Sequence, residues 1–226
     1  MTSENLQMDL EMQARINLYY DLYIPDSLNG PSPLLLTIHG YGAHKRYMMR
    51  EARLVAPKHF VIASLQGPHQ HFRQTDEGYR VGFGWLTDHK PDEYVRLHQT
   101  FVLDVIDKLA ADSLVDRSQI YLHGFSQSCA LNFRFAFTYP EVLKGMVGIS
   151  GGIPGDLETN PIYTPFLAKT LYLYGDTDEF YPLDKFRDFD AKLKEHLPNY
   201  GSKQFAAKHE ITDEMRAEVR KFFLYA

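Results

Sequence analysis

The feature that most constrains the fold is a regular alternation of short apolar runs with longer amphipathic stretches. Residues 34–39 and 60–65 are continuous apolar runs of the length and composition of buried strands. Residues 93–112 instead repeat apolar side chains at the spacing of a helix face. Repeated strand–helix–strand units predict an α/β fold, with a mostly parallel central sheet and helices on both faces.

The same patterns predict the remaining elements. We expect strands at 16–24, 34–39, 60–65, 119–123, 143–149, 170–174 and 204–207, and helices at 48–58, 93–112, 126–139, 183–197 and 212–225. Thr212 is the predicted N-cap of the last helix. Residues 66–92 carry no such pattern and predict an irregular, lid-like segment. The expected organisation is a single domain over residues 1–226, with no separate cap domain.

Charge and cysteine content exclude several functional classes. The net charge is −5 and no basic stretch stands out, which argues against a nucleic-acid partner. No run of about 18 apolar residues occurs, so no transmembrane segment is expected. Cys129 is the single cysteine and the first 20 residues lack an apolar leader, which together favour a cytoplasmic location.

A predicted strand runs directly into Gly124-Phe125-Ser126-Gln127-Ser128, and a helical pattern follows. A serine on such a tight strand-to-helix turn is exposed as a nucleophile, and its neighbours must be small where backbones nearly touch. Gly124 meets that need, whereas Ser128 stands where a second glycine is usual. Ser126 is therefore the candidate nucleophile, with the helix N-terminus directed at any developing oxyanion.

The general base is found by elimination. In chains with this type of turn, the acid and then the histidine follow the serine. Only His196 and His209 lie far enough along the chain. His196 falls within a charged helical stretch, whereas His209 follows a short strand and precedes the last helix. His209 is the candidate base.

The acid is expected just after the predicted strand at 170–174, because catalytic groups gather at the carboxyl ends of parallel strands. Asp176, Asp178 and Glu179 all lie there, and their spacing alone does not choose among them. Glu179 also fits a structural role, as a cap for the helix that begins near Pro182.

Acyl transfer also needs two N–H donors aimed at the oxyanion. One is expected from the backbone of Gln127, the residue after the nucleophile. The other is expected from the loop His39-Gly40-Tyr41-Gly42, which directly follows the first buried strand and whose glycines allow the necessary turn.

From about Pro33 to the C-terminus, the chain resembles the phospholipase/carboxylesterase family of α/β-hydrolases, which includes acyl-protein thioesterases. The resemblance rests on ordered motifs, namely HGYG (39–42), GFSQS (124–128), SGGIP (150–154), YGDTDEFYP (174–182) and KHEIT (208–212). It implies an α/β-hydrolase fold. The family's acid lies three residues after Gly175 and four before Pro182, which implies Asp178.

The resemblance also implies that the two oxyanion donors are Tyr41 and Gln127, and that Trp85 helps to form the substrate pocket. A tryptophan buried in the core is the alternative for Trp85. Departures from the family pattern include Ser128, Tyr174 and the pair Ala207 and Lys208. These departures remove no catalytic group, but they indicate a distant member.

Together these features predict a serine carboxylic ester hydrolase for short to medium acyl esters, which acts on small-molecule substrates through an acyl-enzyme and needs no cofactor or metal. A thioesterase and a non-catalytic binding protein on the same fold are the alternatives. His69 and His71 have the spacing of metal ligands, but this chemistry requires no metal. The oligomeric state stays open, with a homodimer among the options.

Overall fold

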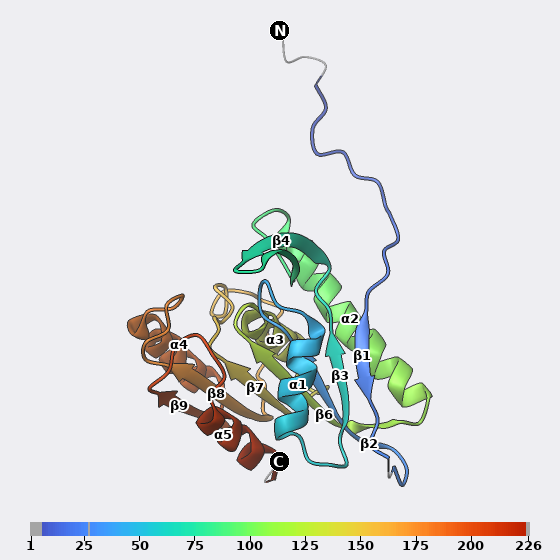
Figure 1. Cartoon of the computed structure of the whole chain (residues 1–226), viewed down its shortest axis with the longest axis vertical. Helices are drawn as coiled ribbons and strands as arrows, with labels where there is room; N and C mark the ends of the chain where they lie inside the picture. The colour runs from blue at the N-terminus through green and yellow to red at the C-terminus, as the bar shows by residue number, and fades with distance from the viewer. Residues whose placement is uncertain (1–5, 27, 225–226) are drawn as a thin grey trace.

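The computed structural model describes residues 6–26 and 28–224. Within them, one seven-stranded sheet has the order β1-β3-β2-β6-β7-β8-β9 (Figure 1). β1 runs antiparallel to β3, and every other pair in this sheet is parallel. The strands are β1 (Tyr20–Tyr23), β2 (Ser32–Ile38), β3 (Val61–Leu65), β6 (Val115–Phe125), β7 (Gly145–Ile149), β8 (Lys169–Gly175) and β9 (Tyr200–Phe205). The predicted α/β class with a mostly parallel sheet is confirmed.

Helices cover both faces of the sheet (Figure 1). α1 (Lys45–Val55) and α5 (Asp213–Leu224) pack on one face. α2 (Pro91–Ala111), α3 (Gln127–Thr138) and α4 (Leu183–His196) pack on the other. Among the described residues, none of the helices is both long enough and apolar enough to cross a bilayer.

The continuous apolar sequence of β2 follows from this two-sided cover. Leu34, Leu36 and Ile38 belong to the core cluster beneath α2, α3 and α4, whereas Leu35 belongs to the cluster beneath α1 and α5. Successive side chains of a strand point to opposite faces, so a strand buried on both faces is apolar at most of its positions. The buried polar exception in β2 is Thr37, whose hydroxyl lies 3.4 Å from the Nδ1 atom of His123. Burial of each leucine stabilises the fold by about 1.5–3 kcal/mol.

The last helix begins where its cap was predicted. The Thr212 hydroxyl accepts a hydrogen bond from the Met215 N–H (3.3 Å), and Asp213 and Glu214 occupy the first turn. Negative charges there are favoured by the helix dipole. The final residue of the predicted helix, Tyr225, lies outside the described residues.

The prediction of an irregular segment over residues 66–92 is wrong in its central part. β4 (His69–Thr75) and β5 (Gly78–Gly84) pair antiparallel as a separate two-stranded sheet. Asp76 and Glu77 form the two-residue turn, and Gly78 (φ 102°) follows it in a backbone conformation that favours glycine. Figure 1 shows this hairpin beyond the end of the sheet, above β3 and α1, and a bridge between Ala43 and Phe83 joins it to the loop after β2.

Candidate active site

Ser126 lies at a sharp turn between β6 and α3. Its φ of 58° and ψ of −122° are strained for a residue with a side chain. The turn is held by a hydrogen bond from the Ser126 N–H to the Ile149 oxygen (2.9 Å). Gly124 allows the close approach of α3, because a Cβ there would lie 2.4 Å from the Asn132 amide nitrogen.

Ser128, the departure from the second glycine, is buried within this turn. Its hydroxyl accepts a hydrogen bond from the Phe125 N–H (2.9 Å) and lies 2.8 Å from the oxygen of Ile38, to which it donates. Ser128 thus links the turn to the end of β2. Both hydrogen bonds depend on its hydroxyl group, which a glycine at this position would lack.

The structure brings Ser126, His209 and Asp178 together, although they lie far apart in the sequence. The His209 Nε2 atom is 2.8 Å from the Ser126 Oγ atom, and the His209 Nδ1 atom is 2.7 Å from a carboxylate oxygen of Asp178. With the Nδ1 proton donated to Asp178, Nε2 is free to accept the serine proton. The arrangement can therefore generate a nucleophilic alkoxide at Ser126.

Backbone hydrogen bonds hold the carboxylate of Asp178 on the side away from His209. Its second oxygen accepts hydrogen bonds from the backbone N–H groups of Phe180 (2.8 Å) and Tyr181 (3.0 Å). The residue is only 8% exposed. These contacts leave one oxygen for His209 and hold it in a single orientation.

The other two candidate acids, Glu179 and Asp176, make different contacts. Glu179 accepts a hydrogen bond from the backbone N–H of His209 (3.1 Å), and this bond lowers the pKa of its carboxyl group. Glu179 therefore supports the histidine loop and does not cap α4 as suggested by the sequence. Asp176 contributes its backbone N–H to the Phe205 oxygen (2.9 Å). Of the three candidate acids, Asp178 is the one that contacts the imidazole ring.

The loop after β2 lies against the nucleophile. A Cβ at Gly40 would lie 2.9 Å from the Ser126 Cβ, so only glycine permits this approach. Tyr41 and Gln127, the predicted oxyanion donors, flank Ser126 in the same cavity. Gly42 has a φ of 74°, which turns the chain away just after Tyr41.

His39 anchors this loop from the core. Its Nδ1–H donates to the Gly40 oxygen (2.7 Å), and its Nε2 accepts from the Gln66 side chain (2.8 Å) and the Gly67 N–H (2.9 Å). Burial lowers the pKa of His39 to about 4, so the ring stays neutral and this pattern of donors and acceptors is retained.

The expectation that Trp85 lines the substrate pocket is wrong. Its side chain is 1% exposed, and its indole N–H donates to the His39 oxygen (2.9 Å). The ring packs edge-on against His98 in the core, and Leu86, the next residue, lines the cavity in its place. Trp85 therefore supports the loop beneath the site without contact to its lumen.

The cavity over Ser126 has a volume of about 570 Å³. No Asp, Glu, Lys or Arg is among the described residues that line it, and His209 is the ionisable partner of the serine. Its walls are mainly small or aromatic, and the lining residues are Gly40, Tyr41, Ala43, Leu86, Phe125, Ser126, Gln127, Ala130, Gly152, Phe180, Tyr181 and His209. Such a lining suits an uncharged, apolar group beside the reacting carbonyl.

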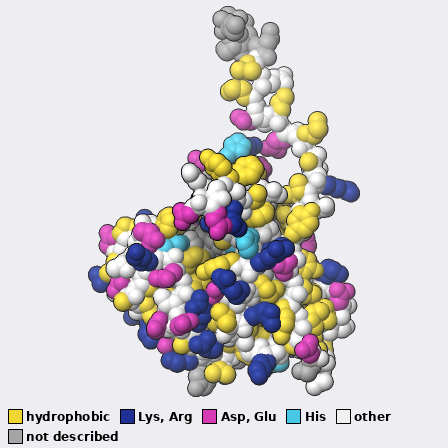
Figure 2. Space-filling view, in the orientation of Figure 1, with side chains coloured by type: hydrophobic (Ala, Val, Ile, Leu, Met, Phe, Trp, Pro, Cys, Tyr) yellow, Lys and Arg dark blue, Asp and Glu magenta, His cyan; other side chains and the backbone are white. Residues whose placement is uncertain are grey.

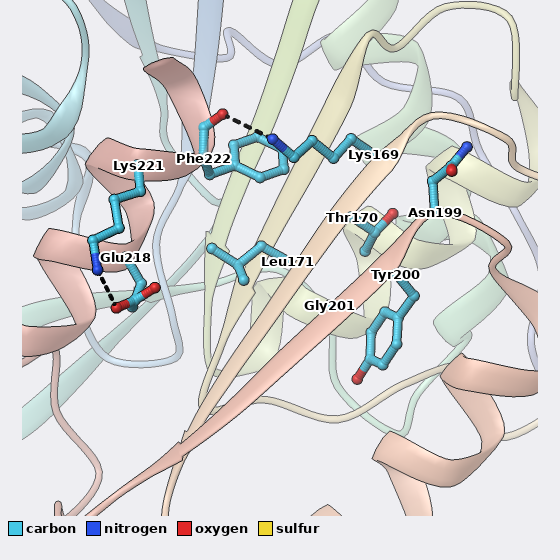
Figure 3. Close-up of a pocket in the computed structure, with 9 residues that line it drawn as sticks. All are labelled: Lys169, Thr170, Leu171, Asn199, Tyr200, Gly201, Glu218, Lys221 and Phe222. Atoms are coloured by element: carbon cyan, nitrogen blue, oxygen red, sulfur yellow. Dashed lines mark hydrogen bonds and ion pairs between the residues drawn. The ribbon is translucent and has the colours of Figure 1, made fainter. Parts of the chain in front are cut away.

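A second hollow, of about 660 Å³, lies between α5 and the starts of β8 and β9 (Figure 3). In it, Lys169 donates to the Phe222 oxygen (3.4 Å) and Lys221 pairs with Glu218 (2.9 Å). Its described lining residues include no serine, cysteine or histidine, so it does not hold the combination of residue types that meets at Ser126.

The histidines that had metal-ligand spacing take part in ring contacts. His71 stacks on Tyr41 with a centroid distance of 4.5 Å, and His69 lies against Tyr94 at 4.0 Å. Within residues 6–26 and 28–224, no group of three or more His, Cys, Asp or Glu side chains could hold a metal ion.

The geometry agrees with the family comparison. Residues 24–226 match the model of the phospholipase/carboxylesterase family. The chain belongs to this family. Solved structures with little sequence identity share its α/β-hydrolase fold. A carboxylesterase from Bacillus cereus aligns with a TM-score of 0.68 at 18% identity over 92% of each chain. Acyl-protein thioesterase 2 of Zea mays aligns with a TM-score of 0.71 at 14% identity, over 92% of this chain and 98% of that one.

A relative with higher identity is NocK, a proposed esterase of Nocardia uniformis subsp. tsuyamanensis. It is 29% identical over 164 residues, which cover 67% of this chain and 42% of NocK. The chain thus spans less than half the length of that relative. The supporting contacts of His39 and Glu179 could not be predicted from the sequence, because each joins distant segments that no local spacing reveals.

Proposed function

We propose that this family member is a serine hydrolase that cleaves carboxylic esters through an acyl-enzyme on Ser126. The observation that carries this proposal is the continuous set of contacts from Asp178 through His209 to Ser126, at 2.7 and 2.8 Å. Membership of the phospholipase/carboxylesterase family supports the same reaction class.

In the first half of the reaction, the Ser126 oxygen attacks the ester carbonyl carbon while His209 Nε2 takes the serine proton. The carbonyl oxygen becomes negatively charged and accepts hydrogen bonds from the Tyr41 and Gln127 backbone N–H groups. As the C–O bond breaks, His209 returns the proton to the departing alkoxide, and the acyl group remains on Ser126.

In the second half, water takes the place of the alcohol. His209 removes a proton from the water as its oxygen attacks the acyl carbon, and the resulting oxyanion meets the same two N–H donors. Collapse of this intermediate returns the proton to Ser126 and releases the carboxylic acid. Asp178 keeps the imidazole in the required tautomer and stabilises its protonated form in both halves.

The proposed substrates are small esters with short to medium acyl groups. The uncharged cavity of about 570 Å³ supports an apolar acyl or alcohol group. Each methylene that fits the cavity adds under about 1 kcal/mol of binding, and further methylenes outside it add nothing. A thioester presents the same carbonyl to the same serine, so thioesterase activity is the alternative.

The test is a p-nitrophenyl ester series from acetate to palmitate, with matched thioesters as a second arm. We expect kcat/KM to peak at acyl chains of about two to six carbons and to fall by about ten to twelve. Ser126→Ala should abolish turnover, whereas Ser202→Ala, at an exposed serine on β9, should not change it.

A steady rise in kcat/KM through palmitate would contradict the short-acyl preference. Strong turnover of the thioesters alone would favour the thioesterase alternative. Turnover that survives in Ser126→Ala would move the nucleophile elsewhere, and no turnover of any ester or thioester would favour the non-catalytic alternative.

A further inference from the structure

The end of β5 makes a two-way contact with the loop that carries the Tyr41 donor. The Gly42 N–H donates to the Phe83 oxygen (2.8 Å), and the Phe83 N–H donates to the Ala43 oxygen (3.1 Å). Reciprocal backbone hydrogen bonds of this kind fix both the distance and the register of two segments. The loop after β2 is therefore tied to the hairpin directly beyond Tyr41.

Two and three residues after Phe83, Trp85 and Leu86 contact the side chain of Gln127, the residue expected to supply the other donor. The Gln127 Oε1 atom accepts a hydrogen bond from the Trp85 N–H (2.9 Å), and its Nε2 donates to the Leu86 oxygen (3.0 Å). The side-chain amide thus pairs with the backbone as another strand would. A carboxylate cannot make the donated bond, and an aliphatic side chain makes neither bond.

Close packing shows that these contacts leave little freedom. A Cβ at Gly82 would lie 2.8 Å from the Gly42 oxygen, and one at Gly84 would lie 3.1 Å from the Tyr41 ring. Trp85 adds its indole N–H to the His39 oxygen, at the start of the same loop (2.9 Å). Residues 83–86 are thus in contact with both segments that supply oxyanion donors.

We infer that residues 83–86 act as a brace that sets the position of the Tyr41 N–H relative to the Gln127 N–H, and that the side-chain amide of Gln127 is a positioning residue. The inference rests on the proposed function for its catalytic consequence. The two donors come from separate elements, the loop after β2 and the first turn of α3. Effective catalysis needs such groups held within about 0.5 Å of their productive positions.

The first variant is Gln127→Leu, which removes both bonds of the side chain, retains similar bulk and keeps the backbone N–H. We expect kcat to fall about 10- to 100-fold, less than the loss of an entire oxyanion donor, with KM within about twofold of wild type. Affinity for a trifluoromethyl ketone, whose adduct with the serine carries an oxyanion, should fall by the same factor as kcat/KM.

The second variant is Gln127→Glu, which has nearly the same shape. Its ionised carboxylate can accept from the Trp85 N–H but repels the Leu86 oxygen, whereas its protonated form can donate to that oxygen. The ratio of its kcat to that of wild type should therefore rise as the pH is lowered through the pKa of the introduced carboxyl group. A loss of activity caused by general destabilisation would show no such recovery.

The matched control is Gln99→Leu. Gln99 is buried, whereas Gln127 is half-buried, and the Gln99 amide donates one hydrogen bond to Thr138 (3.2 Å) away from the site. It should keep wild-type kcat at any temperature below its melting point. Hydrogen exchange gives a readout without activity, because Gln127→Leu should speed exchange at the Trp85 N–H and Gln99→Leu should not.

Unchanged kcat and unchanged Trp85 exchange in Gln127→Leu would overturn the inference. A fall in kcat that disappears on cooling, or that leaves trifluoromethyl ketone affinity intact, would also overturn it. If wild type hydrolyses no ester or Ser126→Ala stays active, the proposed function fails, while the exchange measurement still decides whether the brace exists.

Discussion

Replacement of Asp178 by asparagine should abolish most of the activity while the fold persists. One oxygen of Asp178 already accepts the N–H groups of Phe180 and Tyr181. In Asp178→Asn, the amide oxygen must keep that place, because an NH₂ group there would face two donors. The amide NH₂ is then turned toward His209 Nδ1, 2.7 Å from the replaced oxygen.

An NH₂ donor at this position forces Nδ1 of His209 to be the acceptor, which places the ring proton on Nε2. That nitrogen lies 2.8 Å from the Ser126 oxygen and can no longer accept its proton. We therefore expect kcat to fall by about 10⁴-fold, as for the wrong tautomer in other serine triads, equivalent to about 5.4 kcal/mol of lost transition-state stabilisation.

The assay compares kcat and KM for a p-nitrophenyl ester across three variants with similar melting temperatures. Asp176→Asn and Glu179→Gln are the controls. Asp176 does not contact the imidazole, and Glu179 contacts only the backbone of His209, so both should stay within about tenfold of wild type. A loss at Asp178 no larger than at its neighbours would refute the assignment of the acid.

Two further predictions concern the loop and the core. Gly40→Ala should lower kcat by at least about 100-fold, because its Cβ would lie 2.9 Å from that of Ser126 and displace the oxyanion loop; kcat near wild type would contradict this packing. Acid should destabilise the fold below about pH 6.5, because burial lowers the pKa of His39 and His123 to about 4 and that of His98 to about 3, so the unfolded state takes up the extra protons. The stability present above pH 6.5 should fall by about 2 kcal/mol per histidine at pH 5, measured by urea unfolding across pH, and a flat profile would contradict it.

The mostly parallel sheet with helices on both faces could be predicted because strands that are buried on both faces appear in the sequence as continuous apolar runs. β2 is apolar at successive positions, and this pattern identifies a central strand without any further information. The hairpin could not be predicted in the same way. β4 carries His69, His71 and Arg73 on one face, where ring contacts replace the usual aliphatic packing, so its alternation shows no apolar signal.

The proposed nucleophile and base stand out in the sequence because their local sequences are distinctive: Ser126 has a small neighbour at a strand-to-helix turn, and His209 lies between a strand and a helix. The choice of Asp178 needed the family pattern, since three acids lie within four residues and only the folded loop shows which one reaches the imidazole. The prediction that Trp85 lines the pocket was wrong because a sequence motif shows where the residue lies along the chain but not which way its side chain points, and this side chain is buried.

The most direct test of the central claim is to trap the acyl group. Wild-type protein would be mixed with p-nitrophenyl acetate, quenched in acid during turnover, digested and mapped by mass spectrometry. We expect an acetyl group on Ser126 in the wild type and no adduct at this position in Ser126→Ala. The acetylated fraction should be larger for esters whose acyl-enzyme is hydrolysed more slowly than it forms. Steady ester turnover with the acetyl group on another residue, or with Ser126 unlabelled by a serine-directed phosphonate, would contradict the assignment of Ser126 as the nucleophile.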